Sequence, residues 1–343
     1  MTPRIALDAM SGDHGPSIVI HAALQILSEQ DDLHLILVGD EKKIKQILGH
    51  QSTSVMQRLS IHHAEQVVEM DDKPSYALRN KRESSMRLAI NLVKLGQADA
   101  CVSAGNTGAL MATARYVLKT LPGIDRPAII TALPNMQGKS THLLDLGANV
   151  DVSSEHLFQF AVMGTVLTQA VDNLEKPRIG LLNIGQEEIK GNECVKEAAK
   201  LLTACEGINY IGFVEGDEIY KGSVDVVVCD GFVGNVCLKT TEGVAKMISH
   251  YVKESFTQNW WTRFAALISL PIIKNLRQKI DPRRYNGASL LGLRGIVIKS
   301  HGSADVLSFH HAIKEAVIEV QKNVPSQISH QLANLLNERR RVE

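Results

Sequence analysis

Hydrophobic and polar positions alternate along this chain with two different periods. Short apolar runs predict buried strands, and the longer segments between them, in which apolar residues recur with helical spacing, predict helices. The expected strands are residues 5–7, 33–38, 100–102, 128–132, 142–146, 178–182, 210–214, 224–229 and 295–299. The expected helices include residues 17–28, 84–95, 155–173, 192–203 and 236–253. This alternation predicts an α/β protein with a mostly parallel sheet sandwiched by helices.

One twelve-residue pattern occurs twice, as ADACVSAGNTGA at residues 98–109 and as VDVVVCDGFVGN at residues 224–235. The shared positions are Asp99, Val102, Gly105 and Gly108 in the first copy and Asp225, Val228, Gly231 and Gly234 in the second. Each copy predicts a buried strand that enters a glycine turn at a helix N-terminus, where backbone N–H groups and the helix dipole favour an anion. The first copy, with its hydroxyl and amide side chains, suits an anion best. The second contains an acid and Phe232, so we expect it to orient a donor or shape another part of the site; chance similarity of the two copies is the alternative.

Other expected strands also end in polar turns, and ligands of such folds bind beyond the carboxyl ends of strands. The turns follow Asp8, Asp145, Asn183 and His301. We expect these turns to converge on one edge of the sheet. Their acidic residues are Asp8, Asp13, Asp145, Asp151 and Asp230. We expect these acids to cap helices and turns rather than hold a divalent metal.

Length and charge narrow the class of protein. The 343 residues suffice for two lobes, which we expect at residues 1–135 with 295–343 and at residues 136–294. Lys plus Arg and Asp plus Glu number 37 each, so no net field favours nucleic acid. Neither a signal peptide nor a membrane-spanning run is expected, and the five cysteines lack metal-binding spacing, which favours reduced thiols in the cytoplasm. Without a Walker A or GxGxxG pattern, no nucleotide cofactor and no metal are expected.

Residues 253–299 differ from the rest of the chain. They contain nine Lys or Arg and two acidic residues, a net charge of +7, together with both tryptophans and the apolar run 264–273. This composition predicts a protruding amphipathic helical hairpin at about residues 250–285 that lies in a bilayer interface. The alternatives are packing against another subunit and attraction of an acidic protein. The expected contact residues are Trp260, Trp261, Arg263, Leu267, Lys274, Arg277, Arg283 and Arg284.

The motifs together resemble those of the phosphate acyltransferase (PlsX) family. They are DAMSGDHGP, VSAGNTGALMA, LLDLGAN, NIGQE with KGNE, DGFVGN and GASLLGLRGIVIKSHGSAD, in one order from residue 8 to residue 305. The resemblance implies transfer of a fatty acyl group from acyl carrier protein to inorganic phosphate, which gives acyl phosphate for phosphatidic acid and phospholipid synthesis. It also implies a fold like that of phosphotransacetylases and isocitrate or isopropylmalate dehydrogenases. The sequence departs from the family pattern at Ser11, where a second glycine is expected.

The same resemblance implies a homodimer without a nucleotide cofactor, cytoplasmic and peripherally associated with the inner face of the cell membrane. Its expected partners are acylated acyl carrier protein, inorganic phosphate, the membrane surface and the downstream glycerol-3-phosphate acyltransferase. Two other functions remain open: a phosphate acetyl- or butyryltransferase-like enzyme that uses acyl-CoA, and a non-catalytic acyl-carrier or membrane scaffold.

Phosphate is both nucleophile and dianion in such a reaction, so the enzyme needs an anion site more than a protein nucleophile. The candidate phosphate and substrate ligands are Ser103, Gly105, Asn106, Thr107, Gly108, Lys190, Asp230, Gly231 and Gly234. The thioester carbonyl becomes an oxyanion that needs a fixed donor, and the leaving thiolate needs an acid. The candidates for these roles are His14, Asn235, Lys239 and His301, among which the sequence does not choose. Cys101 and Cys229 lie inside apolar runs, which argues against an acyl-cysteine intermediate.

Overall fold

The computed structural model describes the backbone of residues 2–342 and all of their side chains except those of residues 276–280, 282, 284 and 336–342. The strands are β1 (Arg4–Asp8), β2 (His34–Gly39), β3 (Leu59–His63), β4 (Ala100–Ser103), β5 (Ala128–Pro134), β6 (Ser140–Leu144), β7 (Ile179–Leu182), β8 (Tyr210–Val214), β9 (Val226–Val228), β10 (Ala288–Leu291) and β11 (Ile296–Lys299). The α-helices are α1 (Pro16–Glu29), α2 (Glu41–Leu48), α3 (Thr53–Met56), α4 (Pro74–Asn80), α5 (Ser85–Lys94), α6 (Thr107–Leu118), α7 (Ser154–Asp172), α8 (Glu193–Thr203), α9 (Gly231–Thr257), α10 (Trp260–Ile280), α11 (Val306–Lys322) and α12 (Val324–Val342). Two 3-10 helices, η1 (Glu218–Tyr220) and η2 (Pro282–Tyr285), complete the fold.

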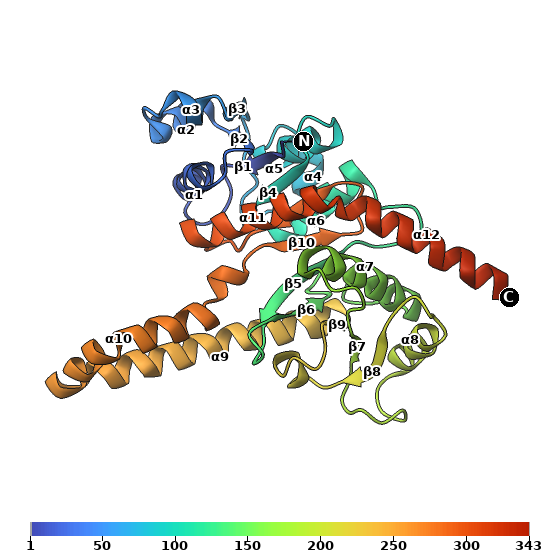
Figure 1. Ribbon diagram of the computed structural model, residues 1–343. Helices are drawn as coiled ribbons and strands as arrows, with labels where there is room; N and C mark the ends of the chain where they lie inside the picture. The colour runs from blue at the N-terminus through green and yellow to red at the C-terminus, as the bar shows by residue number, and fades with distance from the viewer. Residues whose placement is uncertain (1, 343) are drawn as a thin grey trace.

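All of these strands form one sheet of 11 strands in the order β3-β2-β1-β4-β11-β10-β5-β6-β9-β7-β8. The first five strands are parallel, β10 is antiparallel to both of its neighbours, and β6 is antiparallel to β5. Strands β6, β9, β7 and β8 form a second parallel block. The predicted α/β sheet flanked by helices is therefore confirmed (Figure 1).

The two parallel blocks run in opposite directions, because the antiparallel pairing of β5 with β6 reverses the chain. The expectation that all polar turns converge on one edge of the sheet is therefore wrong. The turns after β1, β4 and β11 share an edge, whereas those after β6 and β7 belong to the block of opposite direction.

Each parallel block contains the same Arg–Asp clamp at the amino ends of two neighbouring strands. At the start of β1, the backbone N–H and Nη2 of Arg4 donate to the Asp99 carboxylate at 2.8 and 3.0 Å. Before β7, the same groups of Arg178 donate to Asp225 at 2.7 and 2.8 Å. In both clamps the aspartate N–H donates back to the arginine carbonyl. The sequence repeat is thus also a repeat of structure.

Two hydrophobic clusters divide the helices between the halves of the sheet. α11 packs through Phe309 and Ile313 with α1 and the β1 block, whereas α12 packs through Ile328 and Leu332 with α7 and the β6 block. Asn323, whose left-handed φ is 50°, turns the chain between α11 and α12. The expected division into residues 1–135 with 295–343 and residues 136–294 stays a prediction.

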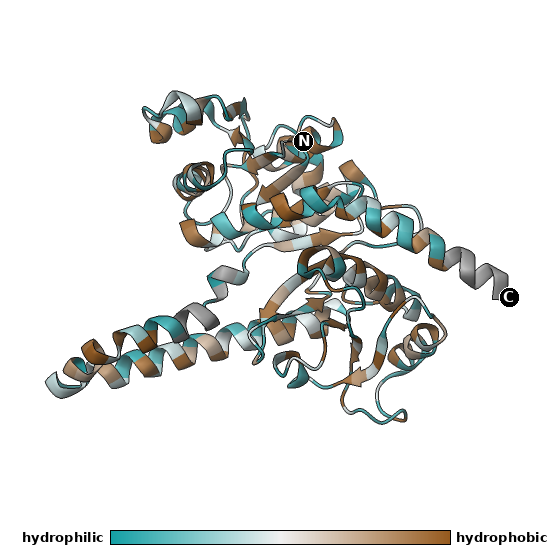
Figure 2. Ribbon diagram, viewed as in Figure 1, coloured by the Kyte–Doolittle hydropathy of each residue, from teal (hydrophilic) through white to brown (hydrophobic). Residues whose placement is uncertain are grey.

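Helices α9 and α10 form a hairpin that projects from the body of the molecule (Figure 1). α9 begins at Gly231, directly after the second copy of the repeat, so the hairpin starts earlier than the predicted residue 250. Apolar residues lie along its exposed length (Figure 2), and the rings of Trp260 and Trp261 stack at 3.7 Å between centroids. No helix in the described part of the chain is both long and apolar enough to cross a membrane.

Candidate active site

Three turns meet where the neighbouring strands β1, β4 and β11 end. The amide of Ala104, after β4, donates to Ser11 Oγ, after β1, at 3.0 Å. The amide of Asp13 donates to the carbonyl of Gly302, after β11, at 2.8 Å. A Cβ on Gly12 would lie only 3.0 Å from that carbonyl, so the first and third turns need glycine to approach this closely. Ser11, the departure from the family pattern, therefore binds one turn to the next.

Asp8 anchors the base of the site. Its buried carboxylate accepts from Ser103 Oγ at 2.7 Å, and Ser103 Oγ accepts from the Gly105 amide at 3.1 Å. Burial raises the pKa of Asp8, and the hydrogen bonds from Ser103 and its neighbours oppose that shift. Ser103 and Gly105, both predicted phosphate ligands, lie in this turn, where the Ser103 hydroxyl and the Gly105 amide form hydrogen bonds within the fold.

The N-terminus of α6 leaves two backbone donors for an outside acceptor. Asn106 caps the helix through Oδ1, which accepts from the Ala109 amide at 2.9 Å, while its Nδ2 donates to the Met70 carbonyl at 2.6 Å. The first amides of a helix have no acceptor within the helix. Those of Thr107 and Gly108 therefore have no acceptor within α6, and the binding of an anion at this turn stays a prediction.

The second copy of the repeat uses its amides within the fold. The Gly231 amide donates to the Asn149 carbonyl at 2.7 Å, and the Gly234 amide donates to the carbonyl of Asp230, the residue that caps α9. A Cβ on Gly234 would lie 1.9 Å from the Asp145 carbonyl oxygen, so this glycine is required by packing. This turn is a joint between α9 and the turn after β6.

Lys299, the last residue of β11, lies beside these turns, although the sequence analysis does not name it as a site candidate. Its side chain is buried, and Nζ donates to the Ala104 carbonyl at 3.4 Å and also to the Ser300 carbonyl. Burial, and then the charge of Lys239, lower the pKa of Lys299 to about 8. In the sequence this lysine ends the apolar run GIVIK, which could have indicated a buried position, but it also belongs to the basic segment 253–299.

α9 from the second half of the fold faces these turns. Lys239 is half exposed and pairs with Glu242 at 3.0 Å. The pKa of His301 is lowered by burial and then by Lys239, which places that ammonium near the His301 ring. Asn235 is exposed one turn before Lys239 on the same face of α9. His301 Nδ1 contacts Ser303 Oγ at 2.9 Å.

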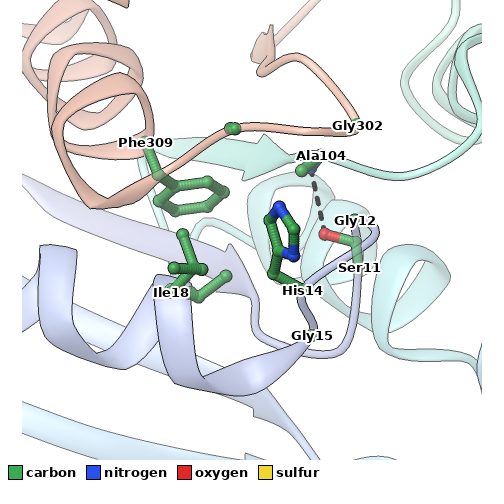
Figure 3. A pocket seen from close by; sticks show the side chains of 10 residues that line it. Ser11, Gly12, His14, Gly15, Ile18, Ala104, Gly302 and Phe309 are labelled. Atoms are coloured by element: carbon green, nitrogen blue, oxygen red, sulfur yellow. Dashed lines mark hydrogen bonds between the residues drawn. The ribbon is translucent and has the colours of Figure 1, made fainter.

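His14 lines a small pocket beside these turns (Figure 3). Its ring points into the pocket, between Ser11 and Ala104 on one side and Ile18 and Phe309 on the other. The structure thus brings His14, Lys299 and His301 to one end of the β1 block.

Other predicted site residues lie elsewhere. Lys190 is exposed on the loop after β7, where its carbonyl accepts from Asn183 Nδ2 at 3.2 Å. Arg283 joins Asp281 at 2.6 Å and Asp305 at 2.8 Å, which ties η2 to the start of α11 and takes it out of the exposed hairpin surface. The remaining described hairpin residues are exposed: Trp260, Trp261, Arg263, Leu267 and Lys274. The side chains of Arg277 and Arg284 lie outside the described residues.

The acidic residues at the strand ends act within the fold. The Asp145 carboxylate accepts from the amides of Ile129, Ala148 and Asn149, and Asp230 accepts from Val233. Across the described residues, no group of three His, Cys, Asp or Glu side chains is arranged to hold a metal ion.

This sheet, with its helices on both faces, has a fold that is also found in a phosphotransacetylase. A phosphotransacetylase from Streptococcus pyogenes superimposes with a TM-score of 0.61 at 16% identity, covering 93% of this chain and 94% of that one. At that identity the likeness shows the fold.

A sequence profile of the family described as "Fatty acid synthesis protein" matches residues 3–327, and the chain belongs to this family. Two curated relatives, each called phosphate acyltransferase, come from Methylococcus capsulatus and Nitrosococcus oceani. The first is 62% identical over 96% of this chain and 97% of its own length, and the second 59% identical over 98% and 99%. The resemblance drawn from the motifs is confirmed, and the protein is an acyltransferase.

Proposed function

We propose that the protein transfers a fatty acyl group from acyl carrier protein to inorganic phosphate. The observation that supports this most is the group of hydrogen-bond donors and ammonium groups at the end of the β1 block. The amides of Thr107 and Gly108 share that end with the ammonium of Lys299, and Lys239 faces it from α9. Such donors suit a phosphate dianion.

In the proposed reaction a phosphate oxygen attacks the thioester carbonyl and forms a C–O bond. The tetrahedral oxyanion then collapses, the C–S bond breaks, and the proton of the phosphate hydroxyl is transferred to the leaving sulfur. Atoms and charge balance, giving acyl phosphate and a free thiol. Holding the two substrates together supplies a large part of the rate.

Asn235 and Lys239, on the face of α9 near the anion site, are the proposed oxyanion donors. His301, with His14 as the alternative, is the proposed group that carries the phosphate proton to the leaving sulfur. Asn106→Ala would remove a helix cap, so Asn235→Ala tests the chemistry more cleanly. A lost donor should lower kcat about 100- to 1000-fold; unchanged kcat for Asn235→Ala would exclude it as donor.

Direct transfer to phosphate, without an acyl-cysteine, is favoured by the state of the two strand cysteines. Cys101 and Cys229 are buried, and burial raises the pKa of both thiols well above the usual range. Both are therefore protonated thiols at neutral pH. Hydroxylamine-sensitive acyl labelling of either cysteine would contradict direct transfer.

The donor is tested by measuring thiol release from acyl carrier protein thioesters and from acyl-CoA, each with and without phosphate. We expect phosphate-dependent release that is faster with the carrier protein, and acyl phosphate that hydroxylamine converts to a hydroxamate. Faster release from acyl-CoA would favour a phosphotransacetylase-like enzyme. No phosphate dependence with either donor would favour a scaffold and contradict the proposal.

The hairpin of α9 and α10 is proposed to hold the enzyme against the inner surface of the cell membrane. Exposed Trp260, Trp261 and Leu267 lie near Arg263 and Lys274, a mixture suited to an anionic bilayer interface. There the enzyme would deliver its acyl phosphate to a glycerol-3-phosphate acyltransferase. A homodimer is also proposed, and light scattering tests it.

The membrane proposal is tested by sedimentation with vesicles that contain anionic phospholipid. Trp261→Glu and Leu267→Glu should each lower the bound fraction. Met136→Glu, which changes an 80% exposed apolar residue outside the hairpin, serves as the control. Equal sedimentation of all three variants and the wild type would contradict the proposal.

A further inference from the structure

Lys299 is a buried ammonium whose hydrogen bonds go to carbonyl oxygens. Its residue is 8% exposed, and Nζ donates to the carbonyls of Ala104 and Ser300. These two carbonyls accept hydrogen bonds from the ammonium but have no negative charge that would neutralise it. Among the described side chains no carboxylate forms an ion pair with Lys299. Burying a charge without a counter-ion is costly, so a site that keeps one is suited to an anion.

The charged groups that face Lys299 come from each surrounding element. They are Asp8 from β1, Asp13 from the turn after it and Lys239 from α9. Burial raises the pKa of the Asp8 carboxyl, which accepts its hydrogen bond from Ser103 Oγ. Burial, and then the charges of Lys239 and Lys299, lower the pKa of His301, which places the two ammonium groups near its ring. Two lysines therefore lie close to these turns, and among the described residues neither Asp8 nor Asp13 forms an ion pair with Lys299.

The position of Lys299 also fits the anion site. In the register of β11 with β4, Lys299 lies opposite Ser103, two residues before the turn that caps α6. The Ala104 carbonyl that Lys299 contacts is followed, three and four residues later, by the free amides of Thr107 and Gly108. The ammonium and the helix N-terminus thus flank the same turn.

We propose that Lys299 binds the phosphate substrate directly, as the buried cation of the site formed with the Thr107 and Gly108 amides. This inference rests on the proposed function in taking phosphate as the acyl acceptor. The competing role is structural: Lys299 would only join the Ala104 and Ser300 carbonyls. The two roles differ in what happens to phosphate binding when the ammonium loses its proton.

The test measures phosphate binding by calorimetry in the absence of an acyl donor. Lys299→Met should raise the phosphate dissociation constant roughly 10- to 100-fold, the effect of removing one charged hydrogen bond. In the full reaction it should raise KM for phosphate and leave KM for the acyl donor unchanged. Lys43→Met, the same change at an exposed residue of α2, should alter neither constant.

A second measurement uses wild-type enzyme and pH. Between pH 8 and pH 10 phosphate stays a dianion, so its affinity should fall by up to about tenfold per pH unit as Lys299 loses its proton. Lys299→Met should lack this dependence. Asn286→Ala disturbs the same turn, because Asn286 Oδ1 accepts from the His301 amide at 3.0 Å, but it keeps the ammonium. Any loss of affinity in Asn286→Ala should therefore follow the wild-type pH curve.

Several outcomes would overturn the proposal. One is an unchanged dissociation constant in Lys299→Met; another is a wild-type affinity that does not fall above pH 8. A third is a loss confined to kcat that disappears with a thioester of a more acidic thiol, because Lys299 would then protonate the leaving group. If Lys299→Met does not fold, Lys299→Gln and the wild-type pH curve decide. Tight phosphate binding without acyl transfer would refute the proposed function and leave this site standing.

Discussion

Removing the buried charge of Lys299 should stabilise the fold at neutral pH. The pKa of Lys299 falls from 10.5 to about 8 in the folded protein, a shift of about 2.5 units. At about 1.36 kcal/mol per unit, the folded state loses roughly 3 kcal/mol by keeping this side chain charged. Lys299→Met also leaves two carbonyls without their donor, at about 1 kcal/mol each. The net gain expected at pH 7 is therefore about 1 kcal/mol.

The change with pH is the sharper part of this prediction. Below pH 8 the amine is charged in both the folded and the unfolded chain, and the full cost is present. Between pH 8 and pH 10.5 the folded amine is neutral while the unfolded chain still binds the proton, so the unfolding free energy of the wild type rises with pH. The advantage of Lys299→Met should thus fall by about 2 kcal/mol between pH 7 and pH 9.5.

Urea denaturation of both proteins at pH 7 and at pH 9.5 measures this difference, because titrations common to both cancel. Lys43→Met provides the matched control and should follow the wild type at both pH values. Parallel curves for Lys299→Met and the wild type would show that Lys299 keeps an ordinary pKa in the folded protein. The physical account of its burial would then be wrong.

Three further predictions concern other parts of the fold. Gly234→Ala places a Cβ 1.9 Å from the Asp145 carbonyl oxygen and should lower the free energy of unfolding by about 3 kcal/mol or more. Gly243→Ala, on the same helix but in open space, should raise it by up to about 1 kcal/mol. Similar stabilities of the two variants would refute the packing role of Gly234. Burial raises the pKa of Glu319, so the folded protein keeps a proton that the unfolded chain loses above pH 4.5. The wild type should therefore lose stability relative to Glu319→Gln as the pH rises, by up to about 1.4 kcal/mol per pH unit. If urea denaturation gives the same stability difference from pH 5 to pH 8, this prediction is contradicted. Asp99→Asn weakens the Arg4–Asp99 clamp and should lower the free energy of unfolding, measured by thermal unfolding, by about 1–2 kcal/mol, while kcat stays unchanged. A much lower kcat in a variant that still folds would instead place the clamp in the catalytic machinery.

Sequence periodicity predicted most of the sheet because its strands are buried on both faces and consist of apolar runs. β3 and β10 were missed for physical reasons. β3 contains the histidines of Leu59–His63 and has exposed positions at the sheet edge, and β10 lies within a glycine-rich segment. The sequence analysis also did not predict the reversal between the two blocks, although the connection from Pro134 to Ser140 is too short for the crossover that parallel pairing of β5 and β6 would need.

The sequence predicts the turns of the candidate site because backbone geometry defines them, but it does not reveal which side chains are buried, and the role of these turns in binding phosphate stays a prediction. A glycine turn before a helix identified the free amides of the first copy. Lys299 and the residues of the hairpin look alike in sequence, because all belong to one basic segment. The fold separates them, with Lys274 exposed on α10 and Lys299 buried beneath three turns.

The two Arg–Asp clamps allow the two parallel blocks of the sheet to be compared residue by residue. When the clamps are superimposed in register, Asp8 at the end of β1 corresponds to Leu182 at the end of β7. The two halves therefore share the same fastening at the start of their strands and differ at the strand end, where one has a buried carboxylate and the other a leucine. Weakening either clamp should lower the stability of the fold. Only in the first half does the strand end supply a carboxylate that holds the next turn, through Ser103.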